Sequence, residues 1–217
     1  MTEAVKPRRR YESRRRAEQA ERTRTDILEA AGVLFRDQGY GVPMTAIAAR
    51  AGVVVETVYR IFGSKASLFT AVVEALLAGG PARARIPVED RPAIRAVRDE
   101  PDPRTQVARY AATQPGIHRR AGPLLRALRD AKAGDAELTR LWDDLEAWRY
   151  EGQGRFAERL AEEGVLRREL SIAEAKDVLW TLCSLATYDS LVRDRGWTDK
   201  RYEAWLSSSL AVELLGC

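Results

Sequence analysis

The chain has 217 residues, of which 45% are hydrophobic and 31% are charged, and its formal net charge is +4. This length fits one large domain, or a small domain joined to a medium one, with enough apolar residues for a buried core. No run of about 18 apolar residues is present, which excludes a membrane-spanning helix. The basic N-terminus has no apolar segment behind it, so it is not a secretory signal. We therefore expect a soluble, cytoplasmic protein.

The positive charge is concentrated at the start of the chain. Residues 1–24 carry a net charge of +5, so the rest of the chain sums to −1. A basic arm of this kind neutralises DNA phosphates and can enter the minor groove, and we include Arg22 and Arg24 among the DNA contacts. We expect residues 1–21 to be a disordered basic arm in the absence of DNA. The alternative is a solvated tail that serves solubility alone.

Three helical segments follow in close succession. Apolar residues recur at helical spacing over 26–38, and Gly39 ends that segment. A short helix opens near Thr45, whose hydroxyl is placed to cap it, and ends before Gly52, a residue that tolerates the left-handed backbone of a sharp turn. Another helix resumes over about 54–61. Two helices joined by a short glycine turn form a helix-turn-helix, whose second helix enters the DNA major groove.

A further helix begins after Ser64, whose side chain is placed to cap it. The segment DILEAAGVLFRDQGYGVPMTAIAARAGVVVETVYRIFGSKASLFTAVVEALL resembles the N-terminal DNA-binding domain of the TetR family of transcriptional regulators. Its most specific residues are Gly52, Val53, Thr57, Tyr59, Phe62, Ser64, Lys65, Leu68 and Phe69. The resemblance implies an all-α protein. It would have a three-helix DNA-binding domain over 22–66, a connecting helix over 67–78, and a helical bundle over 79–217 for ligand binding and dimerisation.

Geometry and the resemblance together assign contacts within the helix-turn-helix. Thr45, Tyr59 and Lys65 are placed to bind phosphates, and Lys65 also lies at a helix N-terminus, where the backbone attracts anions. Base reading falls to the start of the second helix and the turn after it: Val54, Val55, Glu56, Thr57 and Arg60. If Glu56 points into the groove, it accepts a hydrogen bond from cytosine N4; if it points outward, it is only a solvated charge.

The other large apolar residues of this domain are expected to form its core, because a domain this small needs them to hold its helices together. They are Phe35, Ile47, Val53, Val58, Phe62, Leu68 and Phe69.

Beyond residue 79 the sequence changes character. Prolines at 81, 87, 92, 101 and 103 predict a linker or mobile loop, with one short helical turn near Ile94. Breaks are expected at Pro115-Gly116, Gly134, Gly164 and Gly196. Helices are therefore expected over 105–113, 117–132, 136–163, 172–195 and 199–215. No strand pattern competes with them.

In TetR-like proteins such a bundle both dimerises and encloses a ligand. The last two predicted helices carry broad apolar surfaces, which would form a four-helix bundle when packed against their twofold mates. The interface candidates are Leu179, Leu182, Leu185, Ala186, Leu191, Trp205, Leu206 and Leu210. The alternative is that these residues serve only the core of the monomer.

The candidates for the ligand pocket are mostly large apolar residues, with a few polar neighbours to orient a small molecule. They are Tyr110, Gln114, Leu125, Leu128, Trp142, Trp148, Phe156, Trp180, Cys183 and Tyr188. Ordinary core packing is the alternative for each of them. His118, the only histidine, is expected at the surface or at the rim of the pocket. The aromatic residues favour an aromatic or hydrophobic effector.

The resemblance implies a homodimer that binds an inverted-repeat operator in double-stranded DNA, and a repressor that a small molecule releases. A sequence-neutral architectural DNA binder is one alternative, but it leaves the long apolar second domain unexplained. An all-α enzyme with a nucleic-acid tether is another, but one histidine cannot supply paired Glu-x-x-His motifs, and no Gly-rich phosphate loop is present. Cys183 and Cys217 offer no disulfide framework and no metal-ligand spacing, so we expect no metal and no cofactor.

Overall fold

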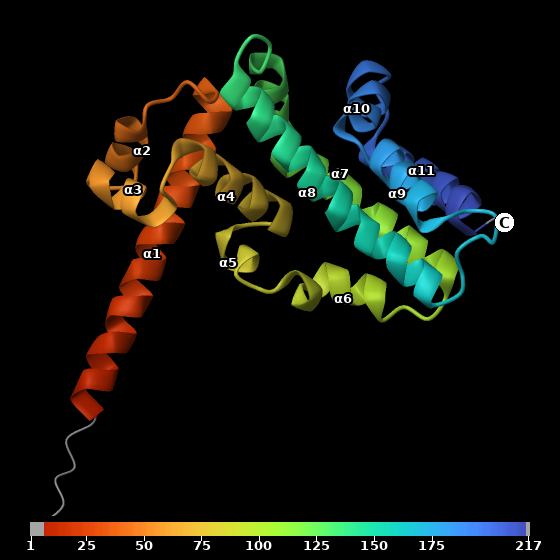
Figure 1. Cartoon of the computed structure of the whole chain (residues 1–217), viewed down its shortest axis with the longest axis horizontal. Coiled ribbons are helices and arrows are strands. Elements are labelled where there is room, and N and C mark those ends of the chain that lie inside the picture. The colour runs from red at the N-terminus through yellow and green to blue at the C-terminus, as the bar shows by residue number, and fades with distance from the viewer. Residues whose placement is uncertain (1–6, 216–217) are drawn as a thin grey trace, which may run out of the picture.

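The computed structural model describes residues 7–215, with side chains from residue 14 onward, and every regular element in that range is a helix (Figure 1). The predicted all-α class is confirmed. In chain order the elements are α1 (Pro7–Gln38), α2 (Met44–Arg50), α3 (Val55–Phe62), α4 (Lys65–Ala78), α5 (Pro81–Ala84), the 3-10 helix η1 (Val88–Asp90), α6 (Pro92–Arg98), α7 (Pro103–Ala131), α8 (Ala136–Glu162), α9 (Ile172–Leu182), α10 (Leu185–Tyr188), the π-helix η2 (Asp189–Asp194) and α11 (Asp199–Leu215).

The helices gather at two ends of the molecule (Figure 1). Helices α1 to α4 pack together at one end, and α4 also contacts α7. At the other end, α11 packs on α7 and α9 packs on α8, while α9 and α11 contact each other. Short α5 and α6 lead from the first group to the second. The helix-turn-helix is thus held at a fixed place relative to the long helices of the C-terminal bundle.

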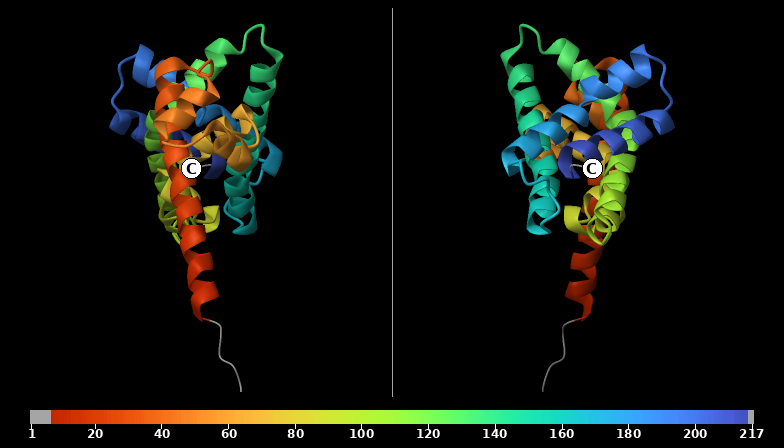
Figure 2. Two further views of the ribbon diagram at one scale, coloured as in Figure 1. Left: turned by 90° about the vertical axis from the view of Figure 1, so that its left-hand side faces the viewer. Right: turned by 90° about the vertical axis from the view of Figure 1, so that its right-hand side faces the viewer.

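Helix α1 differs from the expected disordered arm. It is one continuous helix from Pro7, and its N-terminal half projects away from the rest of the molecule (Figure 2). Residues 14–20 are exposed, and Arg14 Nε pairs with Glu18 Oε1 one turn later, at 3.0 Å. The segment is rich in Arg, Glu, Ala and Gln, all good helix formers, so it extends the folded helix at low cost. Residues 1–6 of the predicted arm lie outside the described residues.

The helix-turn-helix matches its prediction closely, with one correction. Helix α3 is displaced by only one residue from the predicted 54–61, and Gly52 has the left-handed backbone expected of it, with φ of +70°. The Ser64 hydroxyl caps α4 by accepting a hydrogen bond from the Ser67 amide at 3.0 Å. Thr45, however, does not cap α2. The helix begins one residue earlier, after Pro43, whose extended backbone precedes Met44.

The core of this domain lies where α1, α2, α3 and α4 meet. All the predicted core residues are buried except Val53, which is half-buried against the same cluster. Phe35 and Phe69 pack edge to face, with ring centroids 5.1 Å apart. Buried aromatic pairs of this kind stabilise the core by more than their buried apolar area alone would. The amphipathic pattern of the short helices therefore fixes which side of α3 faces inward.

Helix α7 runs through the break predicted at Pro115-Gly116. Pro115 is buried inside the helix, so the contacts made by the rest of α7 outweigh the backbone hydrogen bond that proline removes. Gly122 lies where α10 approaches: a Cβ built at this position would lie 3.3 Å from Leu185 Cδ1. The glycine therefore serves close packing between helices rather than a helix end.

Over residues 172–195 the sequence predicts one helix, but the structure has three separate helical elements there. Helix α9 ends at Leu182, and Ser184 starts α10, its hydroxyl accepting a hydrogen bond from the Thr187 amide at 3.0 Å. A π-helix, η2, continues the chain to Asp194. Ser184 is a good cap residue, but in the sequence it lies within an apolar pattern that reads as uninterrupted. Helix α11 matches its predicted bounds.

Among residues 7–215, no single helix has both the length and the apolar composition needed to cross a membrane. Helices α3 and α4 together meet those criteria as a pair bent by 72°. The apolar residues of α4, including Leu68, Phe69 and Val72, are buried in the core of the N-terminal domain.

Candidate DNA-binding interface and regulatory core

Helix α3 presents one apolar side to the core and another side to solvent. Val58 and Phe62 are buried, whereas Val54 and Tyr59 keep 65% and 48% of their surface exposed. Glu56 and Arg60 are also exposed. Exposed large hydrophobic residues are informative where they gather at a candidate binding surface. The predicted base-reading helix therefore has an exposed face, and an α-helix is an element that the major groove admits.

Two of the predicted base-reading residues are less accessible than the rest. Val55 is half-buried and packs against the core cluster. Thr57 is half-buried and lines a groove of about 520 Å³ between α1 and α3, together with Arg24, Val54 and Arg60. Thr57 thus lies where α3 faces the basic helix α1.

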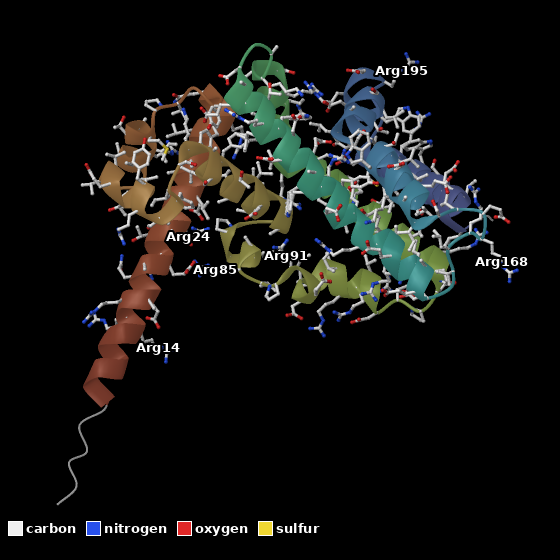
Figure 3. All side chains as sticks on the ribbon, in the orientation of Figure 1. Arg14, Arg24, Arg85, Arg91, Arg168 and Arg195 are labelled. Carbon is white, nitrogen blue, oxygen red and sulfur yellow. The ribbon has the colours of Figure 1, made fainter. Side chains whose placement is uncertain are left out.

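One arginine of α1, Arg24, borders the same groove. The Arg24 guanidinium lies over the Phe62 ring, 4.6 Å from its centroid, so the end of α3 positions this side chain. Arg22 is exposed. Figure 3 shows Arg14 on the projecting part of α1 and Arg24 beside the helix-turn-helix. The sequence predicted basic charge on a flexible arm; from residue 14 on, that charge lies instead on the surface of a helix.

The predicted phosphate contacts lie at the edges of the motif. Thr45 is exposed on the first turn of α2, and Tyr59 is exposed on α3. The Lys65 ammonium lies over the Tyr40 ring, 4.7 Å from its centroid, and burial lowers the pKa of this lysine. The Tyr40 hydroxyl donates to Glu137 Oε1 of α8 at 2.9 Å. Burial, followed by that hydrogen bond, raises the pKa of Tyr40. Lys65 is therefore held in place by a ring that is itself tied to the C-terminal bundle.

Two further contacts join the helix-turn-helix domain to the rest of the chain. Arg85, beside α5, donates to the Glu21 carbonyl at 3.1 Å and to Thr25 Oγ1 at 2.7 Å on α1, as its position in Figure 3 suggests. Arg120 of α7 donates to the carbonyls of Leu76 and Leu77 at 2.7 and 3.3 Å. Both carbonyls belong to the last turn of α4, and that of Leu76 also accepts a hydrogen bond from the Gly79 amide at 3.2 Å.

The C-terminal bundle brings several predicted pocket residues together around α7. Gln106, Tyr110, Gln114 and His118 follow one another at intervals of four residues, which places them on one side of the helix. Tyr110 stacks on Phe156 of α8, with ring centroids 4.2 Å apart. Gln106 was missed in the sequence, although the four-residue spacing of polar and aromatic residues could have revealed it.

His118 is buried, not at the surface or rim as expected. It stacks against Tyr188, with centroids 4.7 Å apart, and meets Tyr202 of α11 edge to face. Burial, followed by the charges of Arg149 and Arg126, lowers the pKa of His118 to about 4, while a hydrogen bond to the Cys183 backbone opposes that shift. The ring is therefore neutral near neutral pH. Tyr202, which is fully buried, was also absent from the predicted set.

Other predicted pocket residues lie elsewhere. Leu125, Leu128 and Trp142 pack with the core of the N-terminal domain, and Trp142 lies 5.1 Å beneath the Lys132 ammonium. Trp148 and Trp180 are each 40% exposed, so they do not line an interior. An apolar residue in a helix can face any of several neighbours, and the sequence pattern does not tell which.

The predicted dimer surface needs a similar correction. Leu179, Leu206 and Leu210 have no exposed surface, and Leu185 is also buried; these four side chains serve the core of the protomer. Four other predicted interface residues keep accessible surface: Leu182, Ala186, Leu191 and Trp205.

The comparisons with known proteins agree with this geometry. Residues 27–72 match the family model described as bacterial regulatory proteins, tetR family. A search of curated sequences returned no significant match. Among solved structures, NalD of Pseudomonas aeruginosa is similar with 22% identity and a TM-score of 0.65, over 91% of this chain and 98% of that one.

Two more structures extend the likeness across the chain. A putative TetR-family regulator from Rhodococcus sp. has 16% identity and a TM-score of 0.66, over 89% of this chain and 98% of that one. FadR of Bacillus subtilis, solved with stearoyl-CoA, has 15% identity and a TM-score of 0.62, over 88% and 98%. At these identities the likeness establishes a shared fold. Residues 27–72, which contain the helix-turn-helix, thus match the TetR family, and the chain as a whole shares the fold of TetR-family regulators.

Proposed function

We propose that this protein is a homodimeric repressor that binds an inverted-repeat operator and releases it when a small molecule binds the C-terminal bundle. The observation that carries the DNA-binding part is the two-sided character of α3. Its inner side is buried with the core, and its outer side exposes Val54, Glu56, Tyr59 and Arg60 next to the basic helix α1. A protein of this kind acts on chromosomal DNA, which is consistent with a cytoplasmic location.

Within the interface, contacts divide into phosphate and base contacts. Thr45, Tyr59 and Lys65 are assigned to phosphates, joined by Arg22 and Arg24 of α1. The exposed start of α3 is assigned to base edges, with Thr57 reached through the groove beside α1. Phosphate contacts set the affinity for any DNA, and base contacts set the preferred sequence.

Dimerisation is assigned to the outer faces of α9 to α11. Leu182, Ala186, Leu191 and Trp205 keep accessible surface there and remain available to a second copy. Reading an inverted repeat requires two α3 helices about 34 Å apart, one helical turn of DNA. We assign this spacing to a twofold dimer formed through the C-terminal bundle.

The release step is assigned to the contacts that join the two parts of the chain. Arg120 binds the end of α4, and Tyr40 binds Glu137 of α8. Movement of α7 or α8 around a ligand would therefore shift the helix-turn-helix and change the spacing of the recognition helices. Some structural relatives are described with small molecules, stearoyl-CoA for FadR and choline for a regulator from Saccharomonospora viridis. NalD is described as a repressor.

Selection of bound sequences from a random duplex pool, with purified protein at physiological salt, tests the proposal. We expect recovery of an inverted repeat whose half-sites lie about one helical turn apart. Tight, salt-sensitive binding that enriches no motif would contradict the proposal and favour a sequence-neutral architectural binder. Absence of binding would refute the DNA-binding role.

A further inference from the structure

The buried cluster of His118, Tyr188 and Tyr202 contains polar atoms that the protein does not satisfy. Among residues 7–215, His118 Nε2 and Tyr202 Oη are both buried and have no hydrogen-bond partner. The side chains are 5% and 0% exposed. A buried polar atom without a partner lowers stability, so such atoms are uncommon in folded proteins. Two of them in one cluster indicate a place built to bind something else.

The hydrogen-bonding chemistry of the two atoms is defined. Because the other ring nitrogen of His118 donates to the Cys183 backbone and the ring is neutral, Nε2 carries a lone pair and acts as an acceptor. Tyr202 Oη is able both to donate and to accept. A hydroxyl group has the chemistry that both atoms need, since it is able to donate a proton to Nε2 and to accept one from Tyr202. Tyr188 is not free to compete, because its own hydroxyl donates to Asp199 Oδ1 at 2.7 Å.

The surroundings favour an uncharged, flat ligand. Each charged group that influences His118 is already paired: Arg126 with Asp189 at 2.8 Å, Arg149 with Glu146 at 2.7 Å, and Asp199 with Arg119 at 2.7 Å. No charge is left over to balance an ionic ligand, and burial of an unpaired ion is costly. The rings of Tyr188 and Tyr202 supply aromatic faces beside the two polar atoms.

The backbone beside the cluster is irregular, and we infer that a ligand reaches the cluster through this segment. Helix α9 stops next to Cys183, whose backbone binds His118, and the chain then forms α10 and the π-helix η2. Gly122 lets Leu185 of α10 lie close to α7. π-Helical turns interrupt the regular hydrogen-bond ladder and occur frequently at functional sites. This segment carries Tyr188 of the cluster and packs against α7 and α11.

We propose that His118 and Tyr202 form the hydrogen-bonding end of the effector site, and that this site takes an uncharged aromatic molecule bearing a hydroxyl group. This inference rests on the proposed function, in which the C-terminal bundle binds an effector. It identifies two anchor residues, of which Tyr202 was not predicted from the sequence and His118 was expected no deeper than the rim of the pocket, and it selects phenols over acids and amines.

Three probes that share one ring system test the ligand class: naphthol, methoxynaphthalene and naphthoate. Binding to the full chain is followed by thermal shift and by quenching of tryptophan fluorescence. We expect naphthol to bind at least about tenfold more tightly than the other two, because only naphthol donates to Nε2 without carrying a charge. Equal binding of the methyl ether, or preference for the carboxylate, would overturn the proposed class. No binding of naphthol would overturn the site.

Two tyrosine variants test the anchor. Tyr202→Phe removes only the unpartnered hydroxyl, so the free protein should keep or gain thermal stability while its affinity for naphthol falls about tenfold. Tyr150→Phe is the matched control, since the Tyr150 hydroxyl donates to Asp177 on α9, outside the cluster; it should leave naphthol binding unchanged. Equal losses in both variants would overturn the assignment.

Operator binding by the same preparations separates this inference from the proposed function. If the protein binds its selected operator but naphthol neither binds nor weakens that complex, the ligand assignment fails and the DNA-binding role stands. If naphthol binds through Tyr202 while no operator is recovered, the site stands and the proposed function fails.

Discussion

Replacing His118 with phenylalanine should remove much of the acid sensitivity of the fold. Burial lowers the pKa of His118 from 6.5 to about 4, so between these values the unfolded chain binds a proton that the folded chain does not. Stability contributed by the neutral ring is fully present above the unfolded pKa and is lost as the pH falls toward the folded pKa. A difference of this size corresponds to roughly 3 kcal/mol in full, and to about 2 kcal/mol between about pH 7.5 and about pH 5.

The assay is chemical denaturation of wild type and His118→Phe at both pH values and at one protein concentration, because dimerisation makes stability depend on concentration. The fall in unfolding free energy on acidification should be about 2 kcal/mol smaller in the variant. Tyr202→Phe is the control: it alters the same cluster but does not titrate in this range, so its stability should fall in parallel with wild type. If the unfolding free energy of His118→Phe fell on acidification as much as that of wild type, the wild-type ring would titrate as an exposed histidine does. Its burial in the cluster would then be wrong.

Three further predictions concern the DNA-binding domain and its connection to the bundle. Tyr59→Phe and Lys65→Ala should weaken binding to all duplexes alike, by about 1 kcal/mol each. Thr57→Val should instead change the preferred sequence in a competition assay. A uniform loss of affinity in all three variants would contradict the division into phosphate and base contacts. Leu68→Ala should lower the unfolding free energy by about 2–5 kcal/mol, because Leu68 is fully buried where α4 meets the core, while Val212→Ala at an exposed site of α11 should cost less than about 0.5 kcal/mol. Arg120→Met should leave operator binding in place but reduce its response to an effector, measured as the ratio of operator affinities with and without ligand; an unchanged ratio would remove Arg120 from the transmission path.

The sequence predicted best those elements whose signals are local. Helix α3 and helix α11 have a turn or cap residue at each end and a repeating apolar pattern between, and both agree with the structure to within one residue. The Ser64 cap and the left-handed Gly52 follow from single-residue preferences that little else opposes. The family resemblance rests on this same segment, which explains why it was recognisable without the rest of the chain.

The errors occur where tertiary contacts decide. Pro115 suggested a break, but packing of α7 holds the helix together across it. Leu206 and Leu210 suggested a dimer interface, because a stripe that packs inside a protomer has the same spacing as one that packs on a partner. His118 was expected near the surface because arginines follow it, and its burial depends on helices α9 to α11, which are far away in the sequence.

Site-specific photocrosslinking tests the central claim most directly. A photoreactive p-benzoylphenylalanine is placed at Val54, at the start of α3, or at Val212 on α11, two valines that are 65% and 52% exposed. With the selected operator, the claim predicts crosslinks from position 54 to bases within each half-site, removed by unlabelled operator and not by unrelated DNA, and none from position 212. Crosslinks from position 212, or their absence at position 54 despite specific binding, would show that a surface other than α3 reads the DNA.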